Sequence, residues 1–123
     1  MEQNSRLYAL RGATGCDNTE YDIQEKVAQL FDDLLKKNDL KEADIVSIQF
    51  TITQDLNILN PAAALRRAGR AQDLALFVAA EPDIRGMLPG IIRILIHCYL
   101  PQGHQPRHVY INGAEQLRPD RAI

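Results

Sequence analysis

Two charged residues interrupt or close runs of apolar residues that favour β-strands. Arg93 lies within the run Ile91–Leu100, and Glu81 closes another run that begins at Leu74. A guanidinium withdrawn from water without an anionic partner costs about 3–5 kcal/mol when one member of a buried pair is missing. Glu81 is the natural partner, because it can take one edge of the guanidinium and leave the remaining N–H donors of Arg93 for a ligand oxygen.

Arg11 is a third candidate for ligand binding. It precedes two closely spaced glycines in the segment Arg11–Gly15, which we expect to form a tight loop at a strand end. The alternative for Glu81 and Arg93 is a structural ion pair, and the alternative for Arg11 is a solvated loop residue. The sequence pattern leaves both alternatives open.

Metal-assisted and covalent chemistry have no comparable support in the sequence. The three histidines, His97, His104 and His108, lack a metal-ligand spacing with carboxylates, so we expect them to pack. No serine or cysteine has a recognisable neighbouring base. We therefore expect no cofactor and no metal ion.

The composition excludes several classes of protein. The 123 residues are 46% hydrophobic and 24% charged with a formal net charge of -2, which predicts one globular domain spanning 1–123 and no basic surface for nucleic acid. The run Ile91–Leu100 is too short to span a membrane. The N-terminal residues lack a targeting pattern, and Cys16 and Cys98 lie far apart, so we expect a cytoplasmic protein with Cys98 packed as a small hydrophobe.

The first half of the chain predicts two strands, a long helix and a short one. A strand is expected at Arg6–Leu10, and a helix at Thr19–Lys37 has an apolar stripe with a capping-box spacing at its start. Strict alternation over Ile45–Thr53 places Val46, Ile48, Phe50 and Ile52 on one face. Asn60-Pro61 predicts the start of a short helix over Ala62–Ala68.

The second half of the chain predicts mainly strands. The run Leu74–Ala80 is typical of a strand buried on both faces, and a longer strand is expected at Ile91–Leu100. Asn112-Gly113 predicts a hairpin between His108–Ile111 and Glu115–Arg118. The elements together indicate an α+β fold with a mixed sheet of about five strands, packed on one long and one short helix, and a second face that a partner subunit partly covers.

Several motifs together resemble the AroH-type monofunctional chorismate mutases. They are Arg11-Gly12-Ala13-Thr14, Pro61-Ala62, Glu81 followed by Arg93, Arg107-His108-Val109-Tyr110 and Leu117-Arg118-Pro119-Asp120. The match extends in order over nearly the whole chain. The resemblance implies a homotrimer arranged as a pseudo-α/β barrel, with active sites between adjacent subunits and chorismate as the small-molecule substrate.

The activity implied by this resemblance is the Claisen rearrangement of chorismate to prephenate, in the shikimate pathway to phenylalanine and tyrosine. It implies that Arg93 is the cation beside the breaking ether oxygen, that Glu81 accepts from the ring hydroxyl and holds Arg93, and that Arg11 binds a carboxylate with help from Tyr110. The other substrate-binding residues implied are Asn60, Ala62, Arg66, Phe77, Val78, Ala79, Ala80, Leu117 and Arg118.

Three positions depart from the pattern of the family. Asn60 stands where an aromatic residue is usual, Ala63 where the helix is often charged, and Val78 where some members have cysteine.

Two alternative functions remain from different classes: a Rid-type imine deaminase, and a non-catalytic trimer that binds a small dicarboxylate. Product analysis distinguishes them, since the outcomes are prephenate, ammonia or unchanged ligand.

Overall fold

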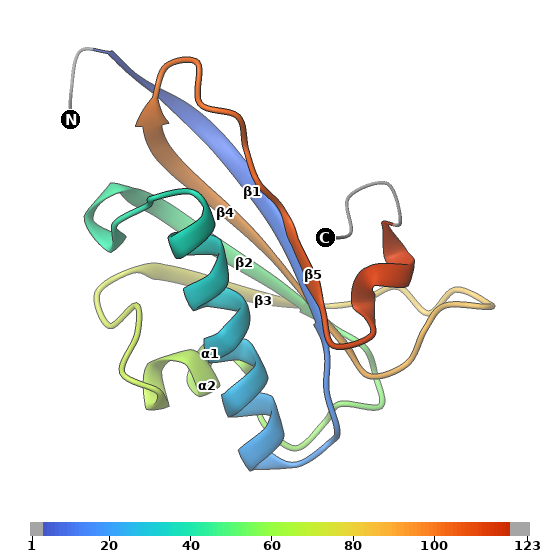
Figure 1. Cartoon of the computed structure of the whole chain (residues 1–123). Coiled ribbons are helices and arrows are strands. Elements are labelled where there is room, and N and C mark those ends of the chain that lie inside the picture. Colours follow the sequence, from blue (N-terminus) through green and yellow to red (C-terminus); the bar gives the residue numbers. More distant parts are fainter. Residues whose placement is uncertain (1–3, 119–123) are drawn as a thin grey trace.

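A computed structural model of the chain describes residues 4–118, which form one mixed sheet with two helices on one face (Figure 1). The strand order is β3-β2-β4-β1-β5. The strands are β1 (Ser5–Gly15), β2 (Ile45–Ile52), β3 (Ala75–Ala80), β4 (Ile91–Pro101) and β5 (Val109–Ile111). The helices are α1 (Glu20–Lys37) and α2 (Pro61–Arg67), and two short 3₁₀ helices are η1 (Glu42–Asp44) and η2 (Ala114–Leu117).

The central strand β4 pairs antiparallel with both β1 and β2, whereas the outer strands β5 and β3 pair parallel with β1 and β2. The predicted α+β class and mixed five-stranded sheet are therefore confirmed. Helices α1 and α2 lie side by side and cover the same face of this sheet (Figure 1). Pro119 and Asp120, which belong to the last of the family motifs, lie outside the described residues.

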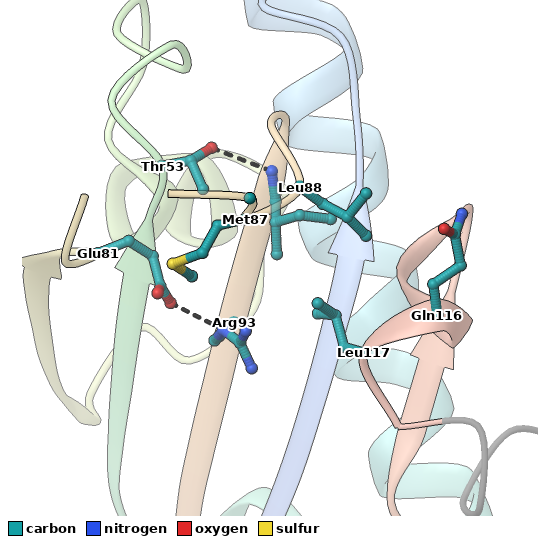
Figure 2. A pocket seen from close by; sticks show the side chains of 9 residues that line it. Thr53, Glu81, Met87, Leu88, Arg93, Gln116 and Leu117 are labelled. Carbon is teal, nitrogen blue, oxygen red and sulfur yellow. Dashed lines mark hydrogen bonds and ion pairs between the residues drawn. The ribbon is translucent and has the colours of Figure 1, made fainter. Parts of the chain in front are cut away.

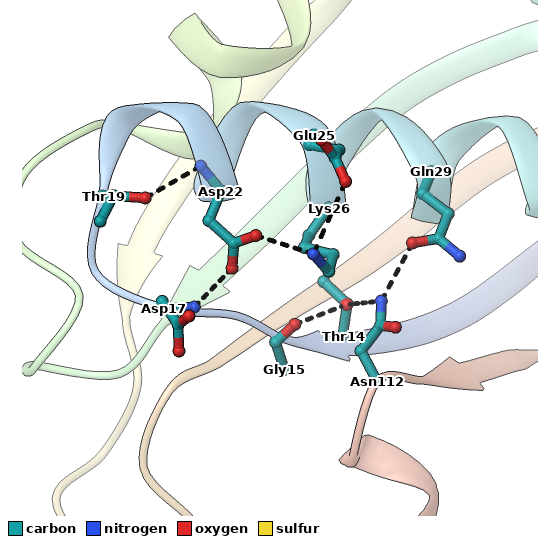
Figure 3. Close-up of polar contacts among 9 residues, drawn as sticks. All are labelled: Thr14, Gly15, Asp17, Thr19, Asp22, Glu25, Lys26, Gln29 and Asn112. Carbon is teal, nitrogen blue, oxygen red and sulfur yellow. Dashed lines mark hydrogen bonds and ion pairs between the residues drawn. The ribbon is translucent and has the colours of Figure 1, made fainter.

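Helix α1 begins and ends where the sequence predicts. The Thr19 hydroxyl accepts a hydrogen bond from the Asp22 N–H at 3.0 Å, and the Asp22 carboxylate binds the Asp17 N–H and Lys26 (Figure 3). The contact with Thr19 satisfies one of the donors that the first helical turn leaves free. The apolar stripe is fully buried and packs on the sheet; it consists of Ile23, Val27, Leu30, Phe31 and Leu34.

Helix α2 is held at its start by the side chain of Asn60. Its oxygen accepts from the N–H groups of Ala62 and Ala63, and Pro61 occupies the first helical position. This confirms the predicted cap and helix. Asn60 is thus engaged as a cap, in keeping with the preference of asparagine for this position.

The segment Arg11–Gly15 is part of β1, so the predicted tight loop is wrong. The two glycines allow neighbouring backbone segments to pack closely, and they do not form a turn. A Cβ on Gly12 would lie 2.9 Å from the Val109 carbonyl oxygen, and one on Gly15 would collide with the Asn112 carbonyl oxygen. Only glycine lets β1 approach β5 and the turn after it this closely.

The turn predicted at Asn112-Gly113 is present, but the returning strand predicted after it, and with it the hairpin, is wrong. Both residues have positive φ angles, 56° and 93°, as such a turn requires, but the chain continues into η2. The Gly113 N–H donates to the Glu115 carboxylate at 2.7 Å, and Ala114 is buried in a small apolar cluster with Tyr110. Local capping and burial thus favour a helical turn over a returning strand.

Two burial patterns differ from those predicted. Strand β3 is an edge strand, so it is not buried on both faces: Phe77 is 66% exposed, while Leu76 and Val78 pack against the helix-side core. In β2, Val46 is exposed because an irregularity between Ile45 and Ser47 shifts the alternation. As a result, the face without helices keeps exposed apolar side chains, as a surface covered by another subunit would.

Candidate active site

The helix-free face of the sheet carries the charged residues singled out in the sequence. Direct strand pairing places Ala79, Thr51, Arg93, Ala13 and Tyr110 in one row across the five strands. Paired residues project from the same face, so Arg93 lies at the centre of the sheet opposite the helices. The apolar neighbours of Arg93 in β4 point the other way into the core.

Arg93 and Glu81 form the ion pair that the sequence predicts. Arg93 Nε lies 2.9 Å from Glu81 Oε1, and the two side chains face one another across the cleft in Figure 2. Glu81 is only 7% exposed, whereas the Arg93 side chain is 37% exposed. The ion pair engages Nε of the guanidinium and not its terminal nitrogens.

Backbone geometry positions Glu81. It follows β3 directly, and its N–H donates to the Ile52 carbonyl at 3.0 Å, which continues the β2–β3 pairing by one residue. The Thr51 hydroxyl then donates to Glu81 Oε1. The nearly buried carboxylate thus has a hydrogen bond from Thr51 and an ion pair with Arg93 on the same oxygen, which offsets the cost of removing its charge from water.

A cleft of about 410 Å³ opens beside this ion pair. Its walls come from the β3–β4 connection and from η2, and Figure 2 shows Met87, Leu88 and Leu117 around Glu81 and Arg93. The cleft thus combines one ion pair with apolar walls, an arrangement suited to a small polar ligand.

A second cleft of about 280 Å³ lies on the other side of Arg93. Arg11, Tyr110 and Arg118 line it together with Arg93. Three arginines around one hollow make an environment that favours an anion. The two clefts share Arg93, so a ligand that spans both would have Arg93 near its middle.

Arg11 reaches this hollow from within β1. Its backbone N–H donates to His108 Nδ1 at 3.0 Å, which ties β1 to the start of β5. His108 thus has a polar contact that fixes the strand carrying Arg11. Tyr110 is buried, and it also borders the cleft.

The end of the β3–β4 connection is anchored by Asp55 and Thr53. Burial opposes ionisation of Asp55, but hydrogen bonds from the Thr53 hydroxyl and the Gly90 N–H hold its pKa below the ordinary value. Thr53 Oγ1 also accepts from the Ile91 N–H at 3.1 Å. This anchoring fixes the base of the loop that carries Met87 and Leu88.

The remaining residues that the resemblance assigned lie elsewhere in a single chain. Asn60, Ala62 and Arg66 belong to α2 on the helix side, and Arg66 contacts the Leu74 carbonyl. In β3, Ala79 and the exposed Phe77 share the face of Arg93, whereas Val78 faces the helices. Of the assigned set, the two clefts of one chain are lined by Arg93, Glu81, Leu117, Arg11, Tyr110 and Arg118.

Sequence reasoning missed several contributors to the site, among them Thr51 and Met87. Thr51 was assigned only to the polar side of an alternating strand, and nothing in that pattern marks it as a partner of Glu81. Met87 lies in a connection without periodicity, so its contribution to the cleft depends on how the loop folds.

The described residues offer no site for a metal ion. Within residues 4–118, no group of three or more histidine, cysteine, aspartate or glutamate side chains could hold one. Burial raises the pKa of the Cys16 thiol to about 12 and that of Cys98 to about 11, which disfavours the thiolate. Neither described helix is long and apolar enough to cross a membrane.

Comparison with known proteins decides the family. The family model described as chorismate mutase type I matches residues 7–121. The chain belongs to the type I chorismate mutase family.

The chain is similar to individual chorismate mutases over most of its length. Chorismate mutase AroH of Bacillus subtilis (strain 168) is 33% identical over 120 residues, or 95% of this chain and 94% of that protein. Chorismate mutase AroH of Thermus thermophilus is 35% identical over 118 residues, or 90% and 95%. The structure of a chorismate mutase from Clostridium thermocellum has a TM-score of 0.78 and 38% identity, covering 89% of this chain and 98% of that one.

Proposed function

We propose that this chain is a chorismate mutase, an isomerase that converts chorismate into prephenate in the biosynthesis of aromatic amino acids. The observation that carries the proposal is the Arg93–Glu81 pair, held between two clefts with the guanidinium only partly engaged. Membership of the type I family supports the same reaction. The comparisons give no support to an imine deaminase or to a non-catalytic binding trimer.

In this mechanism Arg93 is the electrostatic catalyst. The rearrangement breaks a C–O bond while a C–C bond forms within one molecule, and the ether oxygen gains negative charge in the transition state. The terminal N–H groups of Arg93 would donate to that oxygen and bind it more tightly as its charge grows. No nucleophile and no proton transfer is required.

Other residues would select the reactive shape of the substrate. Glu81 would accept from the ring hydroxyl, and Arg11 would bind a carboxylate beside Tyr110 and Arg118, which line the same cleft. Holding both ends of a dianion keeps the two reacting carbons close, which reduces the entropic part of the barrier.

We further propose a homotrimer in which a neighbouring subunit completes each site. The helix-free face of the sheet exposes Leu7 and Phe77, and α2 residues assigned to the cleft lie away from Arg93 in one chain. Contact with a second subunit would bury Leu7 and Phe77. It would also bring Asn60, Ala62 and Arg66 of one subunit to a cleft of the other. Sedimentation equilibrium tests this, with three chains expected and a monomer contradicting it.

We also propose a cytoplasmic location for the enzyme. Cys16 and Cys98 are free thiols, as is usual for proteins in a reducing compartment. Fractionation of cells that express the chain tests this, and recovery with secreted proteins would contradict it.

The experiment that tests the reaction uses purified protein and chorismate. Loss of chorismate absorbance is followed over time, and the product is identified by mass and chromatography. Prephenate formed faster than the uncatalysed rate is expected. Released ammonia from an imine substrate would support the deaminase, and binding without conversion would support the dicarboxylate-binding trimer.

A further inference from the structure

The Thr51 hydroxyl and the Arg93 guanidinium meet on the same oxygen of Glu81. Thr51 Oγ1 donates to Glu81 Oε1, and Arg93 Nε lies 2.9 Å from that oxygen. An ionised carboxylate only accepts, so the hydroxyl proton points at Glu81. Among the described residues, no hydrogen bond or ion pair of Glu81 engages Oε2, which is therefore the oxygen that can face a ligand.

Sheet pairing fixes this three-residue arrangement. Thr51 and Arg93 are directly opposite partners in the antiparallel β2–β4 pair. The hydrogen bond from the Glu81 N–H to the Ile52 carbonyl places the carboxylate over that pair. Threonine is β-branched and has few rotamers, so its hydroxyl is directed at Oε1 by a rigid side chain.

The hydrogen bond from Thr51 restricts how the Glu81 carboxylate can rotate. With Arg93 alone, the carboxylate and the guanidinium could pivot together about one contact, because the Arg93 side chain is 37% exposed. A donor from a neighbouring strand removes that freedom. The separation between Oε2 and the terminal N–H groups of Arg93 then becomes fixed, as transition-state binding requires.

We propose that Thr51 is a positioning residue for the isomerisation, and that its hydroxyl fixes the Glu81 carboxylate and, through it, the Arg93 guanidinium. This inference rests on the proposed function and adds to it a residue that acts through the charged pair. The effect is on the geometry of the transition state more than on the affinity for substrate.

The first test compares two substitutions at position 51. Thr51→Val keeps the shape and removes the hydroxyl, so kcat is expected to fall about 10- to 100-fold, the range for losing a hydrogen bond to a charged group, with KM changed less than about threefold. Thr51→Ser keeps the hydroxyl and is expected to retain kcat within about threefold. Ser47→Ala removes a hydroxyl from the same strand and is the matched control, with kcat unchanged.

Urea unfolding shows whether a loss of kcat comes from lost positioning of Glu81 or from a less stable fold. Valine favours strands, but it leaves the nearly buried Glu81 carboxylate with one hydrogen bond fewer, so Thr51→Val is expected to stay folded and to unfold at the same or a somewhat lower urea concentration than the wild type. Should it fail to fold, Thr51→Ala is measured for the same loss of kcat. Wild-type kcat in a folded Thr51→Val or Thr51→Ala variant overturns the proposal, as does an equal loss in Thr51→Ser.

A second test removes the group through which Thr51 acts. In a Glu81→Ala background the hydroxyl has no carboxylate to hold, so adding Thr51→Val is expected to change kcat less than about twofold. An undiminished 10- to 100-fold loss in that background overturns the proposal. Absence of prephenate formation by the wild type would instead refute the proposed function, so the two failures are distinguishable.

Discussion

Replacement of Arg93 by lysine tests the guanidinium geometry most sharply, because it keeps the charge. Arginine has five N–H donors in a planar fork, and here Nε lies 2.9 Å from Glu81 Oε1 in an ion pair. Lysine places a single ammonium on a flexible chain. It can bind Glu81 or approach a ligand oxygen, but it cannot reproduce the fixed fork that does both.

The expected loss follows from the role assigned to the terminal N–H groups. Removing one preorganised donor to a developing oxyanion typically lowers kcat about 10²- to 10³-fold, or about 2.7–4 kcal/mol in the activation free energy. We expect Arg93→Lys to lower kcat by a factor within that range. The variant should fold, because the Arg93 side chain is 37% exposed and an ammonium there remains in contact with water.

The assay is the initial rate of chorismate loss at saturating substrate, with urea unfolding measured on the same preparations. Arg67→Lys is the matched control, since Arg67 lies on the surface and pairs with the exposed Glu20 at 2.9 Å. Its kcat is expected to equal that of the wild type. A folded Arg93→Lys variant with kcat within threefold of the wild type would show that Arg93 has only a structural role.

Three further outcomes are expected. Saturating kcat should stay nearly constant between about pH 6 and 9, since no proton moves and arginine remains charged; a bell-shaped profile would contradict this. Gly15→Ala should lower the free energy of unfolding by about 1–3 kcal/mol, measured in urea, because its Cβ collides with the Asn112 carbonyl; an unchanged midpoint would contradict the packing argument. The hydrogen bond from Lys26 holds the pKa of Asp22 below its ordinary value. Ionised Asp22 therefore stabilises the fold at pH values above the ordinary pKa, and this stabilisation is lost as the pH falls through the lowered pKa. Asp22→Asn should therefore cost about 0.3–1 kcal/mol at pH 7 and less at pH 3, and a pH-independent difference would count against it.

Patterns that depend on one element were predictable from the sequence. The Thr19 cap, the buried stripe of α1 and the Asn60 cap of α2 are confirmed, because local hydrogen bonding and helical periodicity determine them. The pairing of Arg93 with Glu81 was predictable for a similar reason: a charge inside an apolar strand requires a partner.

Features that depend on neighbouring elements were not predictable in the same way. Two glycines favour a loop in isolation, yet Gly12 and Gly15 lie in β1 because β5 and the following turn approach too closely for a side chain. The turn at Asn112-Gly113 formed as predicted, but burial of Ala114 decided what followed it. An apolar run such as Ala75–Ala80 does not reveal whether a strand is central or at an edge.

The site shows the same division between local and distant determinants. Arg11, Tyr110 and Arg118 line one cleft as the resemblance implied, but Thr51 joins the site only through the pairing of β2 with β4. The roles of Asn60, Ala62 and Arg66 remain predictions, because they depend on contacts with another subunit. Sequence alone indicated the residue types needed for the chemistry, and topology determined which of them meet.

The most direct measurement of the central claim is the rate of chorismate loss with the wild type and with Arg93→Ala, with prephenate identified as the product. Rapid conversion by the wild type, reduced at least 10²-fold in a folded Arg93→Ala variant, is the predicted result. Conversion no faster than the uncatalysed reaction, or an Arg93→Ala variant as fast as the wild type, would contradict it.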